Sequence, residues 1–185
     1  MIWRIILLFF GIFACSTAVI MIKASTEQPV LLAAERLLIA AVLLLPVYLR
    51  DRRRHRAAYT RRHLMLAVVP GLVLGIHFIT WVIGARMAPA ANASLIVNLV
   101  PIAMPFFLIF LVQESLNRQE MLATGLALCG LLILGAGDFN VSRTYFWGDV
   151  LCFGSMLFFT LYLALGRRNR DFPTIWLYVV PLYFV

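Results

Sequence analysis

This sequence has few charged residues. Only 13% of its 185 residues are charged, whereas 63% are hydrophobic, and the mean hydropathy is +0.95. A soluble domain is nearer half apolar and a quarter charged. Water could not dissolve the surface that this chain would expose, so the composition excludes a soluble domain and predicts an all-α membrane protein in a lipid bilayer.

Motifs for catalysis and cofactor binding are also missing. The sequence has no HExxH, GxSxG or P-loop, and no helix carries paired aspartates at membrane depth. Its three cysteines, Cys15, Cys129 and Cys152, lie inside apolar runs and form no CxxC or Cys/His cluster. We therefore expect no enzymatic activity, no metal and no cofactor.

The charge that is present is mostly positive and concentrated. The net charge is +8, and seven of the sixteen basic residues fall between Arg50 and Arg62, in RDRRRHRAAYTRR. A nucleic-acid-binding domain presents such charge on a folded soluble scaffold, which this chain lacks. We therefore exclude nucleic acid as a partner and interpret the basic stretch as a topology signal.

Apolar runs divide the chain into helices. A membrane span takes roughly 20 residues at 1.5 Å per residue. Six runs qualify and a seventh is shorter: Ile2–Ile22, Val30–Leu49, Leu64–Ala85, Ala90–Val112, Met121–Ala136, Phe146–Leu165 and Phe172–Val185. The first run is too long for a signal peptide, so we expect it to be retained. The sequence thus predicts about seven helices joined by loops of about 4 to 14 residues.

The seventh run is predicted to be an incomplete helix. Fourteen residues reach about 21 Å, which is less than the roughly 30 Å hydrocarbon core. A helix that ended there would leave its last carbonyls without partners in lipid. We therefore expect this sequence to be part of a longer protein, poorly stable alone and inactive unless two copies complement each other as a homodimer.

Basic residues are unequally distributed between alternate loops. With the N-terminus in the cytoplasm, the cytoplasmic segments hold twelve Lys and Arg residues, and the opposite loops hold three, Lys23, Arg86 and Arg143. Basic residues are enriched in cytoplasmic loops. We expect a multi-pass protein of the cell membrane whose N-terminus and Arg50–Arg62 loop are cytoplasmic.

Glu35 and Arg36 are the ionisable pair of the second predicted helix. Charges inside the hydrocarbon are costly, and they usually face a partner or a wet cavity. Glu35 lies only about 7 Å deep, so both side chains could also form a structural ion pair or extend to the interface. Both readings stay open, and both residues are candidates for a substrate cavity.

The third predicted helix carries His77, Thr80, Trp81 and Gly84 on one face. Histidine titrates near neutral pH, so His77 could serve proton coupling. The alternative is a histidine that hydrogen-bonds a neighbouring helix. Trp81 suits the aromatic wall of a cavity, although the same spacing occurs on ordinary packing faces.

A polar stripe follows the fourth predicted helix, where Ser94, Asn98, Pro101 and Pro105 are spaced along one face. Each proline leaves a carbonyl one turn earlier without its helical partner, and inside a membrane that carbonyl needs a polar neighbour. We expect a bend near Pro101, with Ser94 and Asn98 turned toward the interior of the bundle as candidate cavity residues. A kinked helix without any ligand is the alternative.

Small residues dominate the other helix faces. The sixth predicted helix has one continuous face, made of Gly148, Cys152, Ser155, Phe159, Tyr162 and Gly166. Ser155 and Tyr162 are its candidate cavity residues. The small residues of this face, Ala123, Ala127 and Gly130 on the fifth helix, and the GxxxG from Gly71 to Gly75 predict close helix packing.

Two segments of the chain share an arrangement. GIFACSTAVIMIKAS and GSMLFFTLYLALGRRN each begin with a glycine, continue with small or hydroxyl residues and end in positive charge. Five helices separate their starts, so the second copy would enter the membrane from the opposite side. We expect one five-helix repeat in residues 1–137 and a partial, inverted second repeat in residues 146–185.

The stretch MAPAANASLIVNLVPIAMPFFLIFLVQESLNRQEMLATGLALCGLLILG resembles the EamA domain of the drug/metabolite transporter superfamily. The matching positions are Pro89, Ser94, Pro101, Glu114, Gly125, Gly130 and Gly135. AAERLLIAAVLLLP is similar to the family's second helix, with Arg36 at the place of its arginine. The resemblance implies ten helices in two inverted repeats and the movement of small metabolites, of which this chain would hold one repeat and part of the next.

These observations favour a secondary transporter that moves a small metabolite or drug-like molecule. The candidate cavity residues are polar, aromatic and charged, which suits amino acids, amines, nucleosides or sugars alike. A non-transporting membrane scaffold or subunit, or an inactive transporter fragment, is the alternative, and an intramembrane enzyme is a third. The expected partners are the lipid bilayer and a small-molecule substrate.

Overall fold

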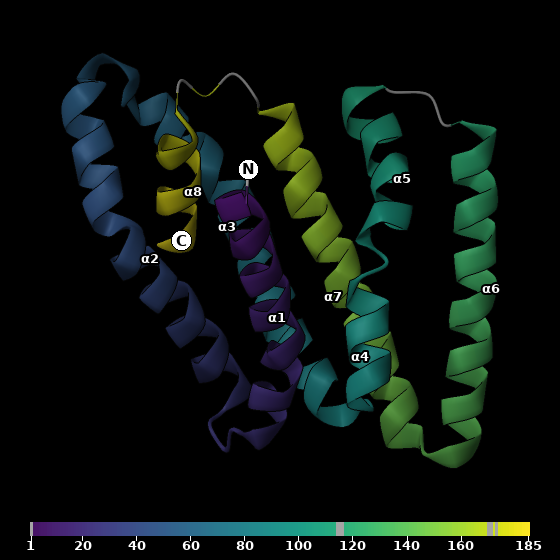
Figure 1. Cartoon of the computed structure of the whole chain (residues 1–185). Helices are drawn as coiled ribbons and strands as arrows, with labels where there is room; N and C mark the ends of the chain where they lie inside the picture. Colours follow the sequence, from purple (N-terminus) through teal and green to yellow (C-terminus); the bar gives the residue numbers. More distant parts are fainter. Residues whose placement is uncertain (1, 114–116, 170–171, 173) are drawn as a thin grey trace.

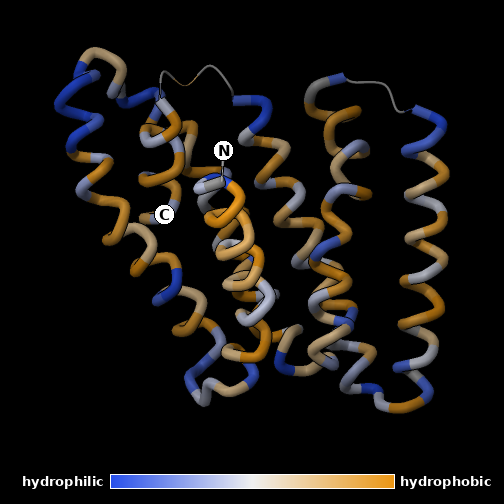
Figure 2. The backbone as a smooth tube through the Cα atoms, viewed as in Figure 1, coloured by the Kyte–Doolittle hydropathy of each residue, from blue (hydrophilic) through white to orange (hydrophobic). Residues whose placement is uncertain are grey.

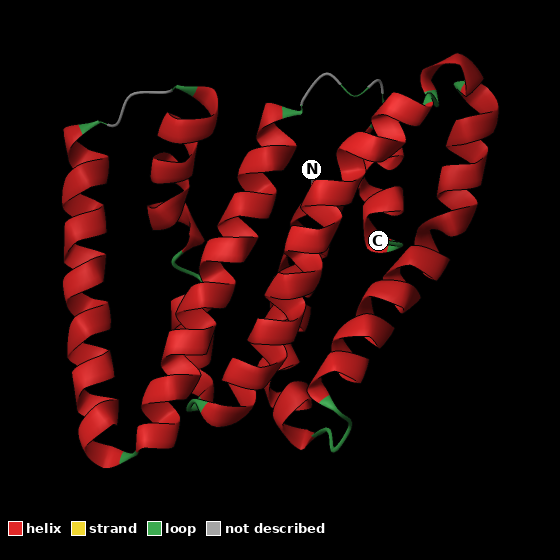
Figure 3. Cartoon of the chain, turned by 180° about the vertical axis from the view of Figure 1, so that it is seen from behind, coloured by secondary structure: helices red, strands yellow, loops and turns green. Residues whose placement is uncertain are grey.

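Helices are the only regular elements in the computed structural model, within the residues that it describes, 2–113, 117–169, 172 and 174–185 (Figure 3). A short 3-10 turn, Arg56–Ala58, accompanies eight α-helices. They are α1 Ile2–Ala24, α2 Pro29–Arg54, α3 Arg61–Met87, α4 Ala90–Val97, α5 Val100–Val112, α6 Arg118–Val141, α7 Arg143–Arg168 and α8 Ile175–Tyr183. Six segments are long and apolar enough to cross a membrane, with α4 and α5 forming one of them. The predicted all-α membrane protein is confirmed.

The long helices lie side by side and run in alternating directions (Figure 1). Figure 2 shows that hydrophilic residues are concentrated at the helix ends, while the lengths between them are mostly hydrophobic. We call the end with the Arg50–Arg62 loop the basic end. The end with Lys23, Arg86 and Arg143 is the Lys23 end. This separation is what a chain needs to place its apolar lengths in lipid.

The fourth predicted span is broken in two. Asn98 and Leu99 separate α4 from α5, with ψ angles near zero that end the first helix. Pro101 then lies in the first turn of α5, where a missing amide costs no helical hydrogen bond. The bend that the sequence predicts near Pro101 is therefore present as a break three residues earlier.

The connection between α6 and α7 is shorter than the sequence suggests. The predicted loop of residues 137–145 is almost entirely helical, and only Ser142, with an extended backbone, separates the two helices. Asp138 stays in the last turn of α6, where its carboxylate accepts a hydrogen bond of 2.7 Å from the Asn92 side chain of α4. The helix thus continues beyond its apolar run, and this contact joins its last turn to α4.

The pair α3 and α7 forms the most extensive helix interface. A Cβ added to Gly84 would lie 2.9 Å from the backbone nitrogen of Cys152, and one added to Gly148 would overlap the backbone of Ala88. The prediction of close packing on this face of α7 is confirmed. On α6, by contrast, Gly125 and Gly130 have no described atom within 4 Å of such a Cβ, so the predicted close approach of α6 is wrong for this chain.

Two basic side chains join α1 to α3 at the Lys23 end. Lys23 Nζ donates to the Arg86 carbonyl at 3.3 Å, and Arg86 Nε donates to the Ile22 carbonyl at 3.2 Å. Both acceptors are last-turn carbonyls, which lack helical donors. Each cation thus supplies a donor to a free carbonyl at the C-terminal end of the other helix. Its positive charge also interacts favourably with the negative end of that helix dipole.

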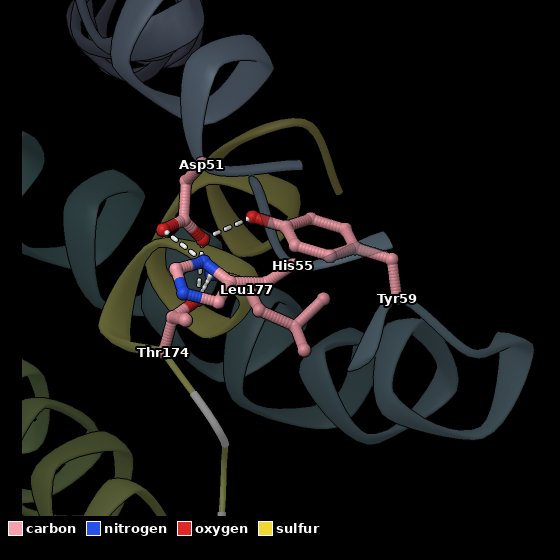
Figure 4. A network of polar contacts seen from close by, with 5 residues as sticks. All are labelled: Asp51, His55, Tyr59, Thr174 and Leu177. Atoms are coloured by element: carbon pink, nitrogen blue, oxygen red, sulfur yellow. Dashed lines mark hydrogen bonds and ion pairs between the residues drawn. The ribbon is translucent and has the colours of Figure 1, made fainter. Parts of the chain in front are cut away.

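The short helix α8 packs against α2 and α3 at the basic end. Thr174, the N-cap residue that precedes α8, accepts a hydrogen bond from the Leu177 amide and donates one of 2.6 Å to Asp51 Oδ2 (Figure 4). The Tyr59 hydroxyl donates to the same oxygen at 2.6 Å, and His55 Nδ1 lies 3.1 Å from Oδ1. One carboxylate therefore connects α2, the following loop and α8.

Candidate substrate site

His77 of α3 and Ser155 of α7 form a buried polar pair between the two most closely packed helices. His77 Nδ1 lies 2.9 Å from the Ser155 carbonyl and 2.8 Å from its hydroxyl, which itself donates to the His77 carbonyl at 3.1 Å. A carbonyl only accepts, so Nδ1 carries the proton and Nε2 is the acceptor in the neutral ring. The structure thus favours the interhelical hydrogen bond over the proton-coupling reading of His77.

An aromatic stack extends from this histidine toward the basic end. The His77 and Phe159 rings lie 4.7 Å apart at 20°, and the Phe159 and Tyr162 rings 5.9 Å apart at 18°. Phe78 meets His77 edge-on at 5.1 Å. Three predicted residues, His77, Ser155 and Tyr162, are therefore brought together, with Phe159 as the link.

Arg36 of α2 reaches the same cluster from the other side. Its guanidinium carbon lies 5.0 Å from the Phe78 ring centroid, within the range of a cation–π contact. Its Nη1 atom is buried and has no hydrogen-bond partner among the described residues. A buried donor of this kind is costly unless something accepts from it.

Of the readings left open for Glu35 and Arg36, the structure does not show an ion pair between the two side chains in the part of the chain that it describes. Glu35 is exposed, and the ion pair recorded among the described residues joins Asp51 and His55 instead. The two side chains are neighbours in sequence and leave the helix in directions about 100° apart, so only Arg36 turns toward α3.

Trp81 lies outside this cluster. It is 6% exposed and packs in an apolar core with Val19, Ile22 and Val82. Trp81 therefore has a packing role in this structure. This agrees with the alternative interpretation of its spacing, an ordinary packing face.

The polar stripe of the fourth span is also separate. Asn98 is exposed and donates a hydrogen bond of 2.7 Å to the carbonyl of half-buried Ser94, and Pro101 is exposed. The expected inward orientation of Asn98 is not seen, because its amide satisfies a carbonyl beside the helix break. As cavity residues, Ser94, Asn98 and Pro101 remain predictions. Glu114 of the same span lies outside the described residues.

An apolar pocket of about 190 Å³ lies between α5, α6 and α7. Thr124 is its one polar side chain, and that hydroxyl donates to the Ile102 carbonyl at 3.2 Å. None of the predicted cavity residues lines it. The polar cluster and the apolar pocket are two separate features of the bundle.

Sequence reasoning missed several residues of functional interest. Phe78, which directly follows His77, was not singled out, and Phe159 was named only as part of the face that contains Ser155 and Tyr162. The spacing of four residues between Ser155 and Phe159 was the signal for a role of Phe159 in the cluster. Asp149 is buried near Asp138, although the two were not recognised as a pair because they lie on different helices. The sequence signal for Asp149 was an isolated acidic residue inside an apolar span, six residues after Arg143.

Residues 2–136 match the model of the family described as EamA-like transporter family. No curated protein and no solved structure matches the chain. The matched segment covers α1 to α5 and most of α6, and it contains Arg36 and His77 but not Ser155 or Tyr162.

Proposed function

Because this chain belongs to the EamA-like transporter family, we propose that it acts as a secondary transporter that moves a small organic molecule across the cell membrane. The proposed binding site is the cluster of Arg36, His77, Ser155 and Tyr162 at the junction of α2, α3 and α7. The basic end would face the cytoplasm, in keeping with the distribution of Lys and Arg.

The unpartnered Nη1 atom of Arg36 is the observation that carries this proposal. A permanent cation held inside an apolar bundle, with a free donor, is poised for an acceptor that the described residues do not supply. A substrate with a carboxylate or another strong acceptor would complete this hydrogen bond.

The rest of the cluster constrains the shape of the substrate. The aligned rings of His77, Phe159 and Tyr162 offer a stacking surface, and the neutral His77 ring leaves Nε2 as an acceptor. We therefore propose a substrate that combines a flat part with an acceptor group, such as an aromatic amino acid or a nucleoside derivative.

Metabolite profiling tests the proposal. Cells that express the protein are compared with cells that express Arg36→Gln, which removes the cation and retains a polar side chain of similar length. The matched control is Arg54→Gln, at the exposed end of the same helix. We expect that expression of the wild type or of Arg54→Gln changes the level of at least one compound inside or outside the cells. Expression of Arg36→Gln should leave the level of that compound unchanged. Equal profiles for wild type and Arg36→Gln would contradict the proposed site.

A further inference from the structure

A polar cavity lies at the basic end, outside the proposed substrate site. Its volume is about 420 Å³, within the range of small-ligand sites. Its walls come from the last turns of α2 and from the loop that follows this helix, and the lining residues are Leu49, Arg52, Arg53, Arg56 and Tyr59. No residue of the proposed substrate site belongs to this cavity.

The loop after α2 folds back over the end of that helix. The Tyr59 ring meets the Tyr48 ring of α2 edge-on at 5.4 Å, and the Tyr59 hydroxyl donates to Asp51 at 2.6 Å (Figure 4). Within the loop, the Tyr59 amide donates to the Arg56 carbonyl at 3.2 Å. These contacts place Arg56 beside the last turn of α2, where it shares the cavity with the two arginines of that turn.

Three positive charges meet in this cavity, and no carboxylate is among its lining residues. Asp51 belongs to the same turn of α2, but its carboxylate is engaged in the hydrogen-bond network of Figure 4. In the part of the chain that the structure describes, no ion pair joins Arg52, Arg53 or Arg56 to a carboxylate. Like charges held this close repel one another, and an anion bound among them would remove that repulsion.

The donors of the cavity suit a phosphate group. A guanidinium group presents a planar fork of N–H donors that matches the oxygens of a phosphate, often with two hydrogen bonds at once. A headgroup that also carries an ammonium group, such as phosphocholine, would bring a further positive charge to the arginines. The cavity therefore favours a phosphate group with a net negative charge.

Leu49 connects the cavity to the apolar length of α2. It is the last residue of the apolar run of this helix, it is 42% exposed, and it lies about 4.5 Å along the helix axis from Arg52. The cavity therefore lies at the boundary between the hydrocarbon core and the polar surface of the bilayer, which is where phospholipid headgroups begin. Basic clusters next to a membrane span attract anionic lipids.

We propose that Arg52, Arg53 and Arg56 form a binding site for the phosphate headgroup of an anionic phospholipid, with Leu49 against the start of its acyl chains. Because the cavity has walls from both α2 and the following loop, the bound lipid would hold the two together and stabilise the folded state. The site does not depend on whether the protein transports a small molecule.

Native mass spectrometry of the purified protein in detergent tests the site. Phosphatidylglycerol and phosphatidylcholine are added at equal concentrations, and we expect the wild type to retain phosphatidylglycerol in preference. A variant that combines Arg52→Gln, Arg53→Gln and Arg56→Gln should lose this preference. Equal retention of the two lipids by the wild type would overturn the proposal.

A matched control separates the cavity from the charge of the loop as a whole. The combination of Arg54→Gln, Arg61→Gln and Arg62→Gln removes the same number of positive charges from the same basic stretch, but outside the cavity. It should bind phosphatidylglycerol at least about tenfold more tightly than the cavity variant, because it keeps the charge-assisted hydrogen bonds to the phosphate. Equal weakening in the two variants would contradict a built site and indicate attraction to the basic stretch in general.

Thermal unfolding in nanodiscs distinguishes a lipid from a soluble phosphate and includes a comparison that needs no variant. The wild type should unfold at a higher temperature in nanodiscs that contain phosphatidylglycerol than in nanodiscs of phosphatidylcholine alone. The cavity variant should lose most of this difference, and the control variant should keep it. An equal rise on addition of inorganic phosphate to the phosphatidylcholine nanodiscs would overturn the assignment to a lipid, and so would equal unfolding temperatures of the wild type in the two lipids.

Discussion

The Thr174 hydroxyl and the Asp51 carboxylate are joined by a hydrogen bond of 2.6 Å across 123 positions of the chain. The same hydroxyl oxygen accepts from the Leu177 amide at the start of α8. Thr174 therefore acts both as the N-cap of α8 and as its attachment to α2.

Removal of this hydroxyl should loosen α8. Thr174→Val keeps the shape of the side chain but loses a hydrogen bond to a charged acceptor, which costs about 2 kcal/mol of unfolding free energy. Chemical denaturation in detergent measures the loss. Thr174→Ser retains the hydroxyl and serves as the control. A Val variant as stable as the Ser variant would show that α8 is held by its apolar contacts alone.

Tyr59, in the loop between α2 and α3, makes the stability of the basic end depend on pH. Burial and the hydrogen bond to Asp51 raise the pKa of Tyr59 above its ordinary value. The folded state therefore resists ionisation of this phenol. Its contribution to stability is complete below about pH 10, the value for an unperturbed tyrosine, and is lost as the pH rises further.

Alkaline unfolding measures this effect. Wild type should lose stability above about pH 10 more steeply than Tyr59→Phe, which cannot ionise. Tyr145→Phe, at an exposed position of α7, is the control and should follow the wild type. Identical curves for wild type and Tyr59→Phe would contradict the role given to Tyr59.

The sequence predicts the helices of this protein better than it predicts its polar contacts. Apolar length and Pro101 are properties of one segment, so the six spans and the break in the fourth could be predicted. The direction of a side chain depends on what the neighbouring helix presents. For this reason the contact of Arg36 with Phe78 could not be predicted, and Asn98 is exposed rather than inward.

The candidate site was partly predictable for the same reason. His77 and Ser155 stand out in their own helices because polar groups in a span need partners. That they are each other's partners depends on the register of α3 against α7, which is set by Gly84 and Gly148. The helical position of Asp138 could not be predicted, because the apolar run of the fifth predicted helix ends at Ala136 and the sequence suggested a loop after it.

Ser155 should contribute a modest share of stability. Ser155→Ala removes the hydroxyl but leaves the carbonyl that accepts from His77 Nδ1, so we expect a loss of about 1 kcal/mol. Ser94→Ala, at a half-buried position of α4, is the control and should change stability by less than about 0.5 kcal/mol. Thermal unfolding in detergent compares the two, and equal losses would contradict the role given to the His77–Ser155 pair.

Gly148 should tolerate no side chain. Gly148→Ala would force a methyl group against the backbone of Ala88, and such overpacking costs about 1–3 kcal/mol. Gly130→Ala places the same methyl group on α6, with no described atom within 4 Å, and should be neutral or stabilise the helix by up to about 1 kcal/mol. A lower unfolding temperature for Gly148→Ala than for the wild type, and an equal or higher one for Gly130→Ala, would confirm the difference. A harmless Gly148→Ala would show that α3 and α7 are packed less closely than described.

The orientation of the bundle can be tested with single cysteines. In a variant without Cys15, Cys129 and Cys152, we expect Arg62→Cys to resist an impermeant thiol reagent on intact cells. Glu27→Cys, at the opposite end, should react. Labelling of Arg62→Cys from outside would reverse the proposed orientation.

The single-residue connection at Ser142 constrains how the bundle can move. Two helices of 24 and 26 residues, each roughly 36–39 Å long, are joined there almost without slack. A rigid rotation about that joint displaces every point in proportion to its distance from it, so the ends at Arg118 and Arg168 travel furthest while the ends at Val141 and Arg143 stay together. The wedge-shaped gap that such a rotation makes widens toward the basic end, and it would admit a molecule to the apolar pocket from that side.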